Sequence, residues 1–177
     1  MNVMEKKELT QKIYEAAYIT GEFLLRSGVI SNEYFDKYRF ESKPELLKGI
    51  AQEMAKTLPG DIEILAALEM GGIPIATALS LETGLPIVFV RKEAKKYGTC
   101  KFAEGMEIKG KKLLIVEDVV TSGGQIIIST EDLRKEGAII EKAVCVIDRQ
   151  SGGPEKLAAA GIELYPLFTM SELKGTK

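Results

Sequence analysis

The sequence contains no histidine, and this absence excludes several kinds of active site. Ser-His-Asp catalysis, Cys-His catalysis and histidine-ligated metal sites are ruled out, and so is the usual acid-base group near neutral pH. Any proton transfer must use carboxylates, lysine, tyrosine, the substrate or water. Cysteine is also scarce, because Cys100 and Cys145 are the only two and have no metal-ligand spacing. They give no sign of a disulfide framework, which is typical of a reducing compartment, so we expect a cytoplasmic protein.

Long apolar runs are absent as well. No stretch approaches the ~20 residues that are needed to span a bilayer, and the charged, polar residues 1–10 do not resemble a secretory signal. The 177 residues, 45% hydrophobic and 28% charged, are ordinary for a soluble globular protein. We therefore expect a single domain over residues 1–177 without a membrane partner.

Basic charge is concentrated in one short stretch. The formal net charge of the chain is −2, yet residues 91–101 carry five bases and one acid. The bases are Arg91, Lys92, Lys95, Lys96 and Lys101. A nucleic-acid-binding protein normally has a broader basic face. A short basic loop on an acidic body favours a small polyanion as the ligand, so we expect no nucleic-acid partner.

The most informative stretch is residues 113–125. Four apolar residues predict a buried parallel strand, two acids follow, and a turn rich in glycine and hydroxyl groups leads into a helix predicted over 125–136. The backbone N–H groups at such a helix start bind anions, and Gly123 and Gly124 allow close approach. Glu117 and Asp118 would repel a phosphate unless they bind sugar hydroxyls or Mg²⁺. The alternative is an acidic pair that only solvates the strand end.

Three further segments follow predicted strands. Residues 69–74 form a glycine turn between a strand at 62–68 and a helix that begins at Pro74, which makes them a second candidate anion site or an ordinary turn. Residues 91–105 predict a long loop, functional or merely solvated. Residues 148–153 form a turn that contains Arg149, either a carboxylate ligand or a surface arginine.

Strands and helices alternate along the chain, with about five buried strands. This pattern predicts an α/β fold with a central parallel five-stranded sheet flanked by helices. The loops 69–74, 91–105, 117–125 and 148–153 should then converge at the carboxyl ends of the strands. Before the sheet we expect a helix over 5–18, two short strands at 23–26 and 31–36, and a helix that begins at a capping box over 42–45.

The chain resembles a known family over nearly its whole length. Residues 113–125 match the phosphoribosyl-pyrophosphate (PRPP) signature of type I phosphoribosyltransferases, with Gln125 bulkier than usual, and match neither the P-loop nor the dinucleotide pattern. Residues 21–36, 91–105 and 148–153 are similar to the base-covering segment, the catalytic loop and the orotate-binding Asp-Arg turn of orotate phosphoribosyltransferases. Arg26 stands where that family usually has lysine, Tyr97 where it has histidine, and Gly71 where some members have lysine.

The resemblance implies that PRPP and orotate, with Mg²⁺, give orotidine 5′-monophosphate and pyrophosphate. It implies Lys95, Glu117 and Asp118 as catalytic residues, with Mg²⁺ carried by PRPP and Asp118 as its one candidate protein contact. The residues implied for PRPP are Arg91, Lys92, Lys95, Tyr97, Glu117, Asp118, Val119, Val120, Thr121, Ser122, Gly123, Gly124 and Gln125. The residues implied for the pyrophosphate loop are Glu69, Met70, Gly71 and Gly72, and those for orotate are Arg26, Tyr34, Phe35, Thr121 and Arg149.

The resemblance also implies an assembly and an internal division. We expect a homodimer in which loop 91–105 acts across the interface, because a two-fold dimer makes such sharing reciprocal. A small hood, residues about 1–40 plus the C-terminal segment, should cover a core of about 41–168. Two alternatives remain open: a phosphoribosyltransferase for another base, and a non-catalytic PRPP-binding regulator, for which no nucleic-acid-binding module is visible.

Overall fold

The computed structural model describes residues 4–25, 28–93 and 101–175 of the chain. Its strands are β1 (Tyr18–Leu24), β2 (Ile30–Phe35), β3 (Ile64–Leu68), β4 (Ile87–Val90), β5 (Ala103–Glu104), β6 (Lys112–Val120), β7 (Ile139–Asp148) and β8 (Glu163–Thr169). Its helices are α1 (Lys6–Ala17), α2 (Tyr38–Glu41), α3 (Pro44–Ala55), α4 (Gly72–Thr83), α5 (Gly124–Lys135), α6 (Gly153–Ala159) and α7 (Met170–Lys174). None of the helices in this described part has the length and apolar character needed to span a membrane.

The centre of the fold is a sheet with the strand order β5-β4-β3-β6-β7-β8. The five strands β3, β4, β6, β7 and β8 pair in parallel, which confirms the predicted sheet. The short β5 adds an antiparallel edge strand on β4. The sequence predicts a loop over these residues, because two residues are too few to show the alternation that marks a strand.

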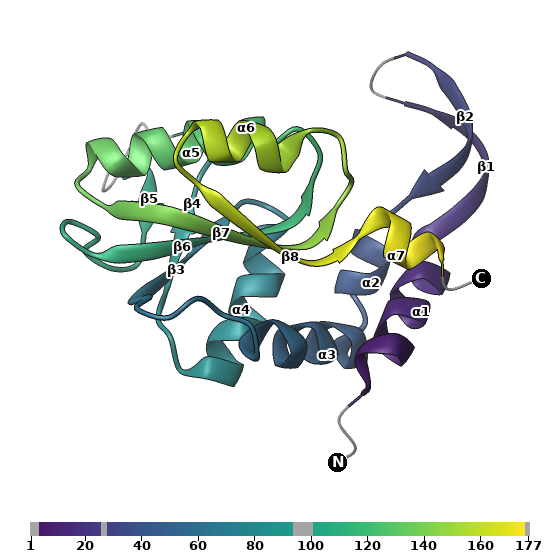
Figure 1. Ribbon diagram of the computed structural model, residues 1–177, viewed down its shortest axis with the longest axis horizontal. Coiled ribbons are helices and arrows are strands. Elements are labelled where there is room, and N and C mark those ends of the chain that lie inside the picture. Colours follow the sequence, from purple (N-terminus) through teal and green to yellow (C-terminus); the bar gives the residue numbers. More distant parts are fainter. Residues whose placement is uncertain (1–3, 26–27, 94–100, 176–177) are drawn as a thin grey trace.

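Helices cover both faces of the sheet, as Figure 1 shows: α3 and α4 lie on one face and α5 and α6 on the other. Each face has its own core. One core joins the sheet to α1, α3 and α4, and the other joins it to α5 and α6. All five residues of β3 are buried, as expected for a central parallel strand that is covered on both sides.

The strand order contains a switch point between β3 and β6. From β3 the chain passes through α4 to β4, which lies on one side of β3. From β6 it passes through α5 to β7 and then through α6 to β8, and both of these strands lie on the other side. The two neighbouring strands therefore send their following loops in opposite directions. In open α/β sheets a ligand binds in the crevice that this divergence leaves at the carboxyl ends.

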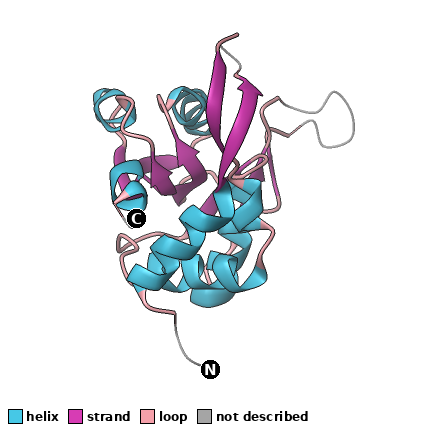
Figure 2. Ribbon diagram, turned by 90° about the vertical axis from the view of Figure 1, so that its right-hand side faces the viewer, coloured by secondary structure: helices cyan, strands magenta, loops and turns pink. Residues whose placement is uncertain are grey.

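The N-terminal part differs in detail from the prediction. Strand β1 begins at Tyr18, directly after α1, and forms a hairpin with β2 that stands away from the sheet (Figure 2). Helix α7 packs against α1 near the base of this hairpin. The capping box predicted at 42–45 is wrong, because the N-cap of α3 is Lys43, whose side chain makes no capping bond. A capping box does occur at α7, between Thr169 and Glu172.

Candidate active site

The predicted phosphate turn forms an open hollow at the carboxyl end of β6. The hollow is lined by Glu117, Val119, Val120, Thr121, Ser122, Gly123, Gly124, Gln125 and Ile126. The structure thus brings together the residues of 117–125 that the sequence assigned to PRPP, apart from Asp118. Gly123 has a φ of 74°, a left-handed value that suits glycine, and a Cβ there would lie 2.9 Å from Leu157 Cγ.

Two helix N-termini lie side by side at the switch point. Helix α5 begins beside the hollow, and α4 begins at the end of the neighbouring strand β3. Neither helix has a side-chain cap or an acidic residue in its first turn. The first-turn N–H groups of α5 are therefore available to an anion, and the helix dipole favours negative charge there. At α4 the Ile73 N–H donates to the Met70 carbonyl at 3.2 Å and Pro74 has no N–H, so the donors there are the N–H groups of Gly71 and Gly72. This arrangement can hold two phosphate groups of one ligand.

The turn before α4 lies directly on β6 because it lacks side chains. A Cβ on Gly72 would lie 2.3 Å from the carbonyl oxygen of Val116, and a Cβ on Gly71 would lie 1.7 Å from Asp118 Oδ2. Both distances are far below ordinary contact. At Gly72 the close atom is backbone, so a side chain does not fit there, whereas at Gly71 a side chain would have to displace the Asp118 carboxylate. The missing lysine at position 71 has a local explanation, since the Asp118 carboxylate occupies the space that a side chain would need.

The two adjacent acids face different surroundings. Glu117 lines the hollow, whereas Asp118 is completely buried. Asp118 Oδ2 lies 2.5 Å from Lys37 Nζ, and Asp118 Oδ1 accepts a hydrogen bond of 2.6 Å from the Val119 N–H. Glu41 is close by and buried, and neither of its carboxyl oxygens has a hydrogen-bond partner among the described residues.

The surroundings of this cluster disfavour several negative charges at once. Burial, followed by the charge of Asp118, raises the pKa of Glu117 well above its usual range. Burial, followed by contact with Asp118, raises the pKa of Glu41 to about 9. Burial opposes ionisation of Asp118 as well, but its contacts with Glu117 and Lys37 lower its pKa. The cluster therefore repels a phosphate less than its sequence suggests.

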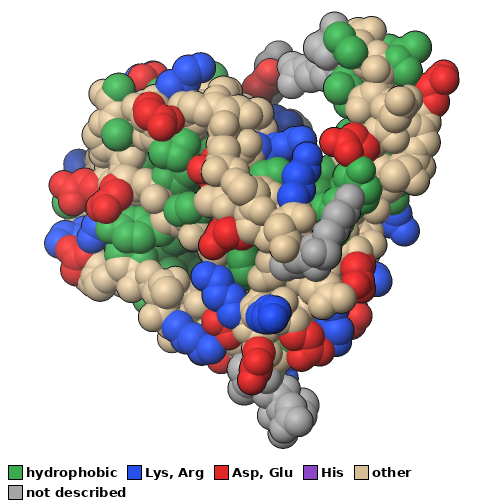
Figure 3. Space-filling view, turned by 45° about the vertical axis from the view of Figure 1, so that its right-hand side comes forward, with side chains coloured by type: hydrophobic (Ala, Val, Ile, Leu, Met, Phe, Trp, Pro, Cys, Tyr) green, Lys and Arg blue, Asp and Glu red, His purple; other side chains and the backbone are tan. Residues whose placement is uncertain are grey.

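A second pocket lies between the hairpin and the carboxyl end of β7, where basic, acidic and apolar side chains adjoin (Figure 3). It is lined by Tyr18, Leu25, Ser31, Glu33, Tyr34, Phe35, Arg149, Met170 and Lys174. The structure thus brings together three of the residues predicted for orotate, namely Tyr34, Phe35 and Arg149. Thr121 instead lines the hollow, and Arg26 lies outside the described residues. The Arg149 N–H donates to the Val120 carbonyl at 2.9 Å, so this pocket adjoins the hollow.

The start of the basic loop lies beside the predicted pyrophosphate turn. The Lys92 N–H donates to Glu69 Oε1 at 2.5 Å, and Arg91 Nε lies 3.4 Å from Glu104 Oε1. Arg91 and Glu69 also line a common pocket. Lys95 and Tyr97 lie outside the described residues.

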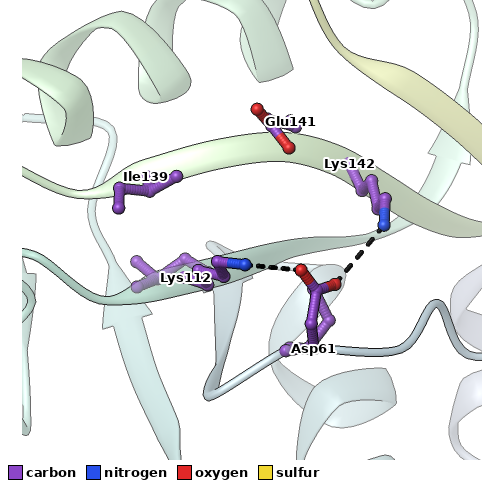
Figure 4. A pocket seen from close by; sticks show the side chains of 7 residues that line it. Asp61, Lys112, Ile139, Glu141 and Lys142 are labelled. Carbon is purple, nitrogen blue, oxygen red and sulfur yellow. Dashed lines mark hydrogen bonds and ion pairs between the residues drawn. The ribbon is translucent and has the colours of Figure 1, made fainter.

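Another small recess lies at the opposite, amino-terminal edge of the sheet, and its charges pair with one another. Asp61 points between two ammonium groups, 2.6 Å from Lys112 Nζ and 3.5 Å from Lys142 Nζ (Figure 4). Lys112 is the first residue of β6, so these ion pairs connect strand starts. The recess is therefore part of the scaffold and lies away from the loops that form the hollow.

Several residues near these pockets are not predicted from the sequence. Four with polar or charged side chains are Tyr18, Lys37, Glu41 and Lys174. The helical pattern of the sequence predicts Tyr18 as the end of a helix, whereas in the structure it begins β1. The β-branched residues Ile19 and Thr20 are the signal for this strand. The other three carry no local signal, since their positions depend on how α2 and α7 pack against the sheet.

Comparison with known proteins identifies relatives over almost the whole chain. The family model described as "Phosphoribosyl transferase domain" matches residues 40–162. A protein from a Nocardioides species named orotate phosphoribosyltransferase is 47% identical over 159 residues, which cover 90% of this chain and 89% of the relative. A protein of the same name from Methanocaldococcus jannaschii is 38% identical over 174 residues, or 98% of this chain and 99% of the relative.

Solved structures show the same fold. The orotate phosphoribosyltransferase of Mycobacterium tuberculosis H37Rv, crystallised with Fe(III) dicitrate, superposes with a TM-score of 0.86 at 27% identity. The match covers 95% of this chain and 98% of that one. The orotate phosphoribosyltransferase of Aeropyrum pernix gives a TM-score of 0.82 at 29% identity, with 94% and 96% of the two chains covered.

Proposed function

Because this chain belongs to the orotate phosphoribosyltransferase family, we propose that it transfers the 5-phosphoribosyl group of PRPP to orotate. The products are orotidine 5′-monophosphate and pyrophosphate, in the synthesis of pyrimidine nucleotides. The observation that carries the proposal is the convergence of two anion-binding helix starts and a basic aromatic pocket at one edge of the sheet.

PRPP carries phosphate at both ends of its ribose, and the site offers a helix start for each. Thr121 to Gln125, at the start of α5, bind the 5′-phosphate with backbone N–H groups and hydroxyls. Glu69 to Gly72, at the start of α4, bind the pyrophosphate. Glu117 lies on the hollow beside them and binds the ribose hydroxyls, either as an acceptor or, when protonated, as a donor.

Orotate occupies the pocket under the hairpin. The guanidinium of Arg149 binds its carboxylate in a bidentate manner, and the rings of Tyr34 and Phe35 cover the base. The backbone bond from Arg149 to Val120 fixes this pocket next to the ribose site. The attacking N1 atom is thereby held near C1 of the ribose, which lowers the entropic part of the barrier.

In the reaction N1 of orotate loses its proton to solvent, the bond between C1 and the pyrophosphate oxygen breaks with its electron pair going to the pyrophosphate, and the N1 anion forms the new bond to C1. Positive charge develops on the ribose and negative charge on the leaving pyrophosphate. Fixed donors that point at the leaving group favour this separation. The N–H groups of the α4 turn supply such donors, and we assign the same task to Arg91, Lys92 and Lys95.

The donor set agrees with Mg²⁺ that arrives with PRPP. Among the described residues, no cluster of three or more acidic, cysteine or histidine side chains could hold a metal by itself. Mg²⁺ is commonly bound by one or two carboxylates together with substrate phosphates, and Glu117 supplies a carboxyl group on the hollow. The ion would neutralise charge on the pyrophosphate. Asp118 is buried and paired with Lys37, so it does not face the hollow.

We also propose that the protein is a homodimer whose loop 91–105 acts in the partner's site. Closing a basic loop over a charged transition state excludes water and strengthens electrostatic contacts. Lys95→Ala and Asp118→Asn chains are each first shown to be nearly inactive, and are then unfolded, mixed and refolded, with the presence of mixed dimers confirmed. Mixed dimers regain activity if the loop acts in trans, because one of their two sites then carries neither defect, and they stay inactive if it acts in cis.

The decisive experiment for the reaction compares bases. The protein is incubated with PRPP and Mg²⁺ and with orotate, uracil, hypoxanthine or adenine, and base consumption is followed. Uracil is the matched control, since it lacks only the carboxylate that Arg149 binds. We expect orotate to be consumed much faster than the others. Equal or faster consumption of uracil or a purine would refute orotate as the substrate.

A further inference from the structure

Asp118 joins three parts of the molecule that are distant in sequence. It belongs to β6, its Oδ2 occupies the space above Gly71 in the turn before α4, and the same oxygen lies 2.5 Å from Lys37 Nζ. Lys37 and Glu41 both belong to the segment around α2, between the hairpin and α3. The side chain of Lys37 is 33% exposed and that of Asp118 only 1%, so the lysine reaches inward to the acid.

The same segment continues directly from the base pocket. Tyr34 and Phe35 at the end of β2 line that pocket, and Lys37 follows after one intervening residue, Asp36. Asp36 is fixed at both ends, because its N–H donates to the Ala17 carbonyl at 2.8 Å and its Oδ1 accepts from the Tyr38 N–H at 3.1 Å. A shift of the base-covering strand therefore moves the backbone that carries Lys37.

From this geometry we propose that Lys37, supported by Glu41, is a positioning residue that ties the base-covering hairpin to Asp118 and, through Asp118, to the pyrophosphate turn at Gly71. The inference rests on the proposed function of that turn. Lys37 lines neither the hollow nor the base pocket. It acts by holding the Asp118 carboxylate against the turn at Gly71.

Physical reasons favour a role beyond folding. A buried carboxylate that loses its cation keeps an uncompensated charge, and it must gain a proton, admit water or move. Asp118 is completely buried and its Oδ2 packs against Gly71, so movement toward the turn pushes on the Gly71 backbone. Displacement would therefore pass to the turn, whose N–H groups we assign to the pyrophosphate. A displacement of about 1 Å at such a site costs on the order of a hundredfold in rate.

The chain offers a matched control for the ion pair. Lys56 Nζ lies 2.5 Å from Glu53 Oε1, the same distance as in the Lys37 pair, and the Glu53 side chain is only 9% exposed. That pair lies at the C-terminal end of α3 and contacts none of the residues that line the hollow. Lys37→Met and Lys56→Met thus remove the same group from equally short pairs with buried acids.

The test measures PRPP binding and steady-state kinetics for both variants. We expect Lys37→Met to weaken PRPP binding and to lower kcat/KM for PRPP by about tenfold to a hundredfold, with less effect on the KM for orotate. Lys56→Met should stay within about twofold of the unmodified protein, because neither Lys56 nor Glu53 lines the hollow. In an Asp118→Asn background, Lys37→Met should have little further effect on PRPP binding, because the charge that it held is gone.

Two results would overturn the inference: equal PRPP binding by Lys37→Met and Lys56→Met, or the full effect of Lys37→Met in the Asp118→Asn background. If Lys37→Met does not fold, Lys37→Gln carries the same comparison, with thermal unfolding to confirm that it is native. PRPP binding is measured without a base. The inference is therefore tested even if orotate proves not to be the substrate, and failure of the proposed function is recognised separately in the assay with different bases.

Discussion

Gly72→Ala is a direct test of the turn between β3 and α4, because the clash it creates has one defined partner. The new Cβ would lie 2.3 Å from the carbonyl oxygen of Val116, 3.2 Å from its carbonyl carbon and 3.5 Å from Glu117 Cα. All three are backbone atoms of the central strand β6, so no side-chain rotation can relieve the contact. Ordinary contact begins at 3.4 Å. The start of α4 must therefore move away from β6 by roughly 1 Å.

The size of the effect follows from that movement. Forcing extra volume into a packed region costs typically about 1–3 kcal/mol of stability. A 1 Å displacement of a group that positions substrate costs on the order of a hundredfold in rate. We therefore expect Gly72→Ala to fold, to unfold at lower urea concentration, and to lose about two orders of magnitude in kcat/KM for PRPP.

Gly60→Ala is the matched control for this prediction. No atom lies within 4 Å of a Cβ built on Gly60, so the same methyl group enters open space. Both variants are measured by urea unfolding and by kinetics with PRPP as the varied substrate. If Gly72→Ala loses stability but keeps the activity of Gly60→Ala, the turn at 69–72 is structural and does not hold the pyrophosphate.

Three other predictions address the remaining parts of the site. Arg149→Ala should raise the KM for orotate more than that for PRPP, with a loss on the order of 1.5–3 kcal/mol in orotate binding; the opposite order would place the base elsewhere. Lys95→Ala should lose most of the activity and Tyr97→Phe should lose little. The reason is that a tyrosine pKa near 10 is too high for the side chain to replace histidine as a proton donor. If Tyr97→Phe loses more activity than Lys95→Ala in the same assay, the catalytic role assigned to Lys95 is wrong. Glu41 stays protonated to about pH 9 in the folded protein but ionises near its ordinary pKa of 4.5 when unfolded. The folded state therefore holds more protons between these pH values, and stability falls as the pH rises through this range. Glu41→Gln should remove this fall when melting temperature is measured against pH. Parallel plots of melting temperature against pH for the two proteins would contradict the prediction.

Much of the sheet was predictable because its strands carry strong local patterns. The run Leu113 to Val116 and the run Ile64 to Leu68 are continuous apolar segments, each followed by a glycine turn, and both became buried parallel strands. Their following loops had to meet at one edge, since parallel strands place their carboxyl ends together. The convergence of the four loops was thus a consequence of topology.

The base pocket was predictable only in part. Tyr34, Phe35 and Arg149 were named from motifs, and the structure places them around one pocket. Lys174 lines the same pocket from the end of the chain, and its ion pair with Glu33, at 3.5 Å, joins α7 to the hairpin. Nothing near Lys174 in the sequence signals this contact, because it depends on the packing of α7 against α1.

The alternation of side chains along a strand changes the functional interpretation of the acidic pair Glu117 and Asp118. Successive side chains of a strand point to opposite sides, so Glu117 and Asp118 could not both face one ligand. The structure follows this rule: Glu117 lines the hollow, and Asp118 turns to Lys37 and Gly71. The sequence analysis treated them as one unit beside the phosphates and therefore needed a ligand to offset two negative charges. The ion pair with Lys37 offsets the charge of Asp118, and burial disfavours the charge of Glu117, so the repulsion is reduced before any ligand binds. In the proposed function, the PRPP site at this edge therefore uses the cation of Lys37 together with the PRPP signature.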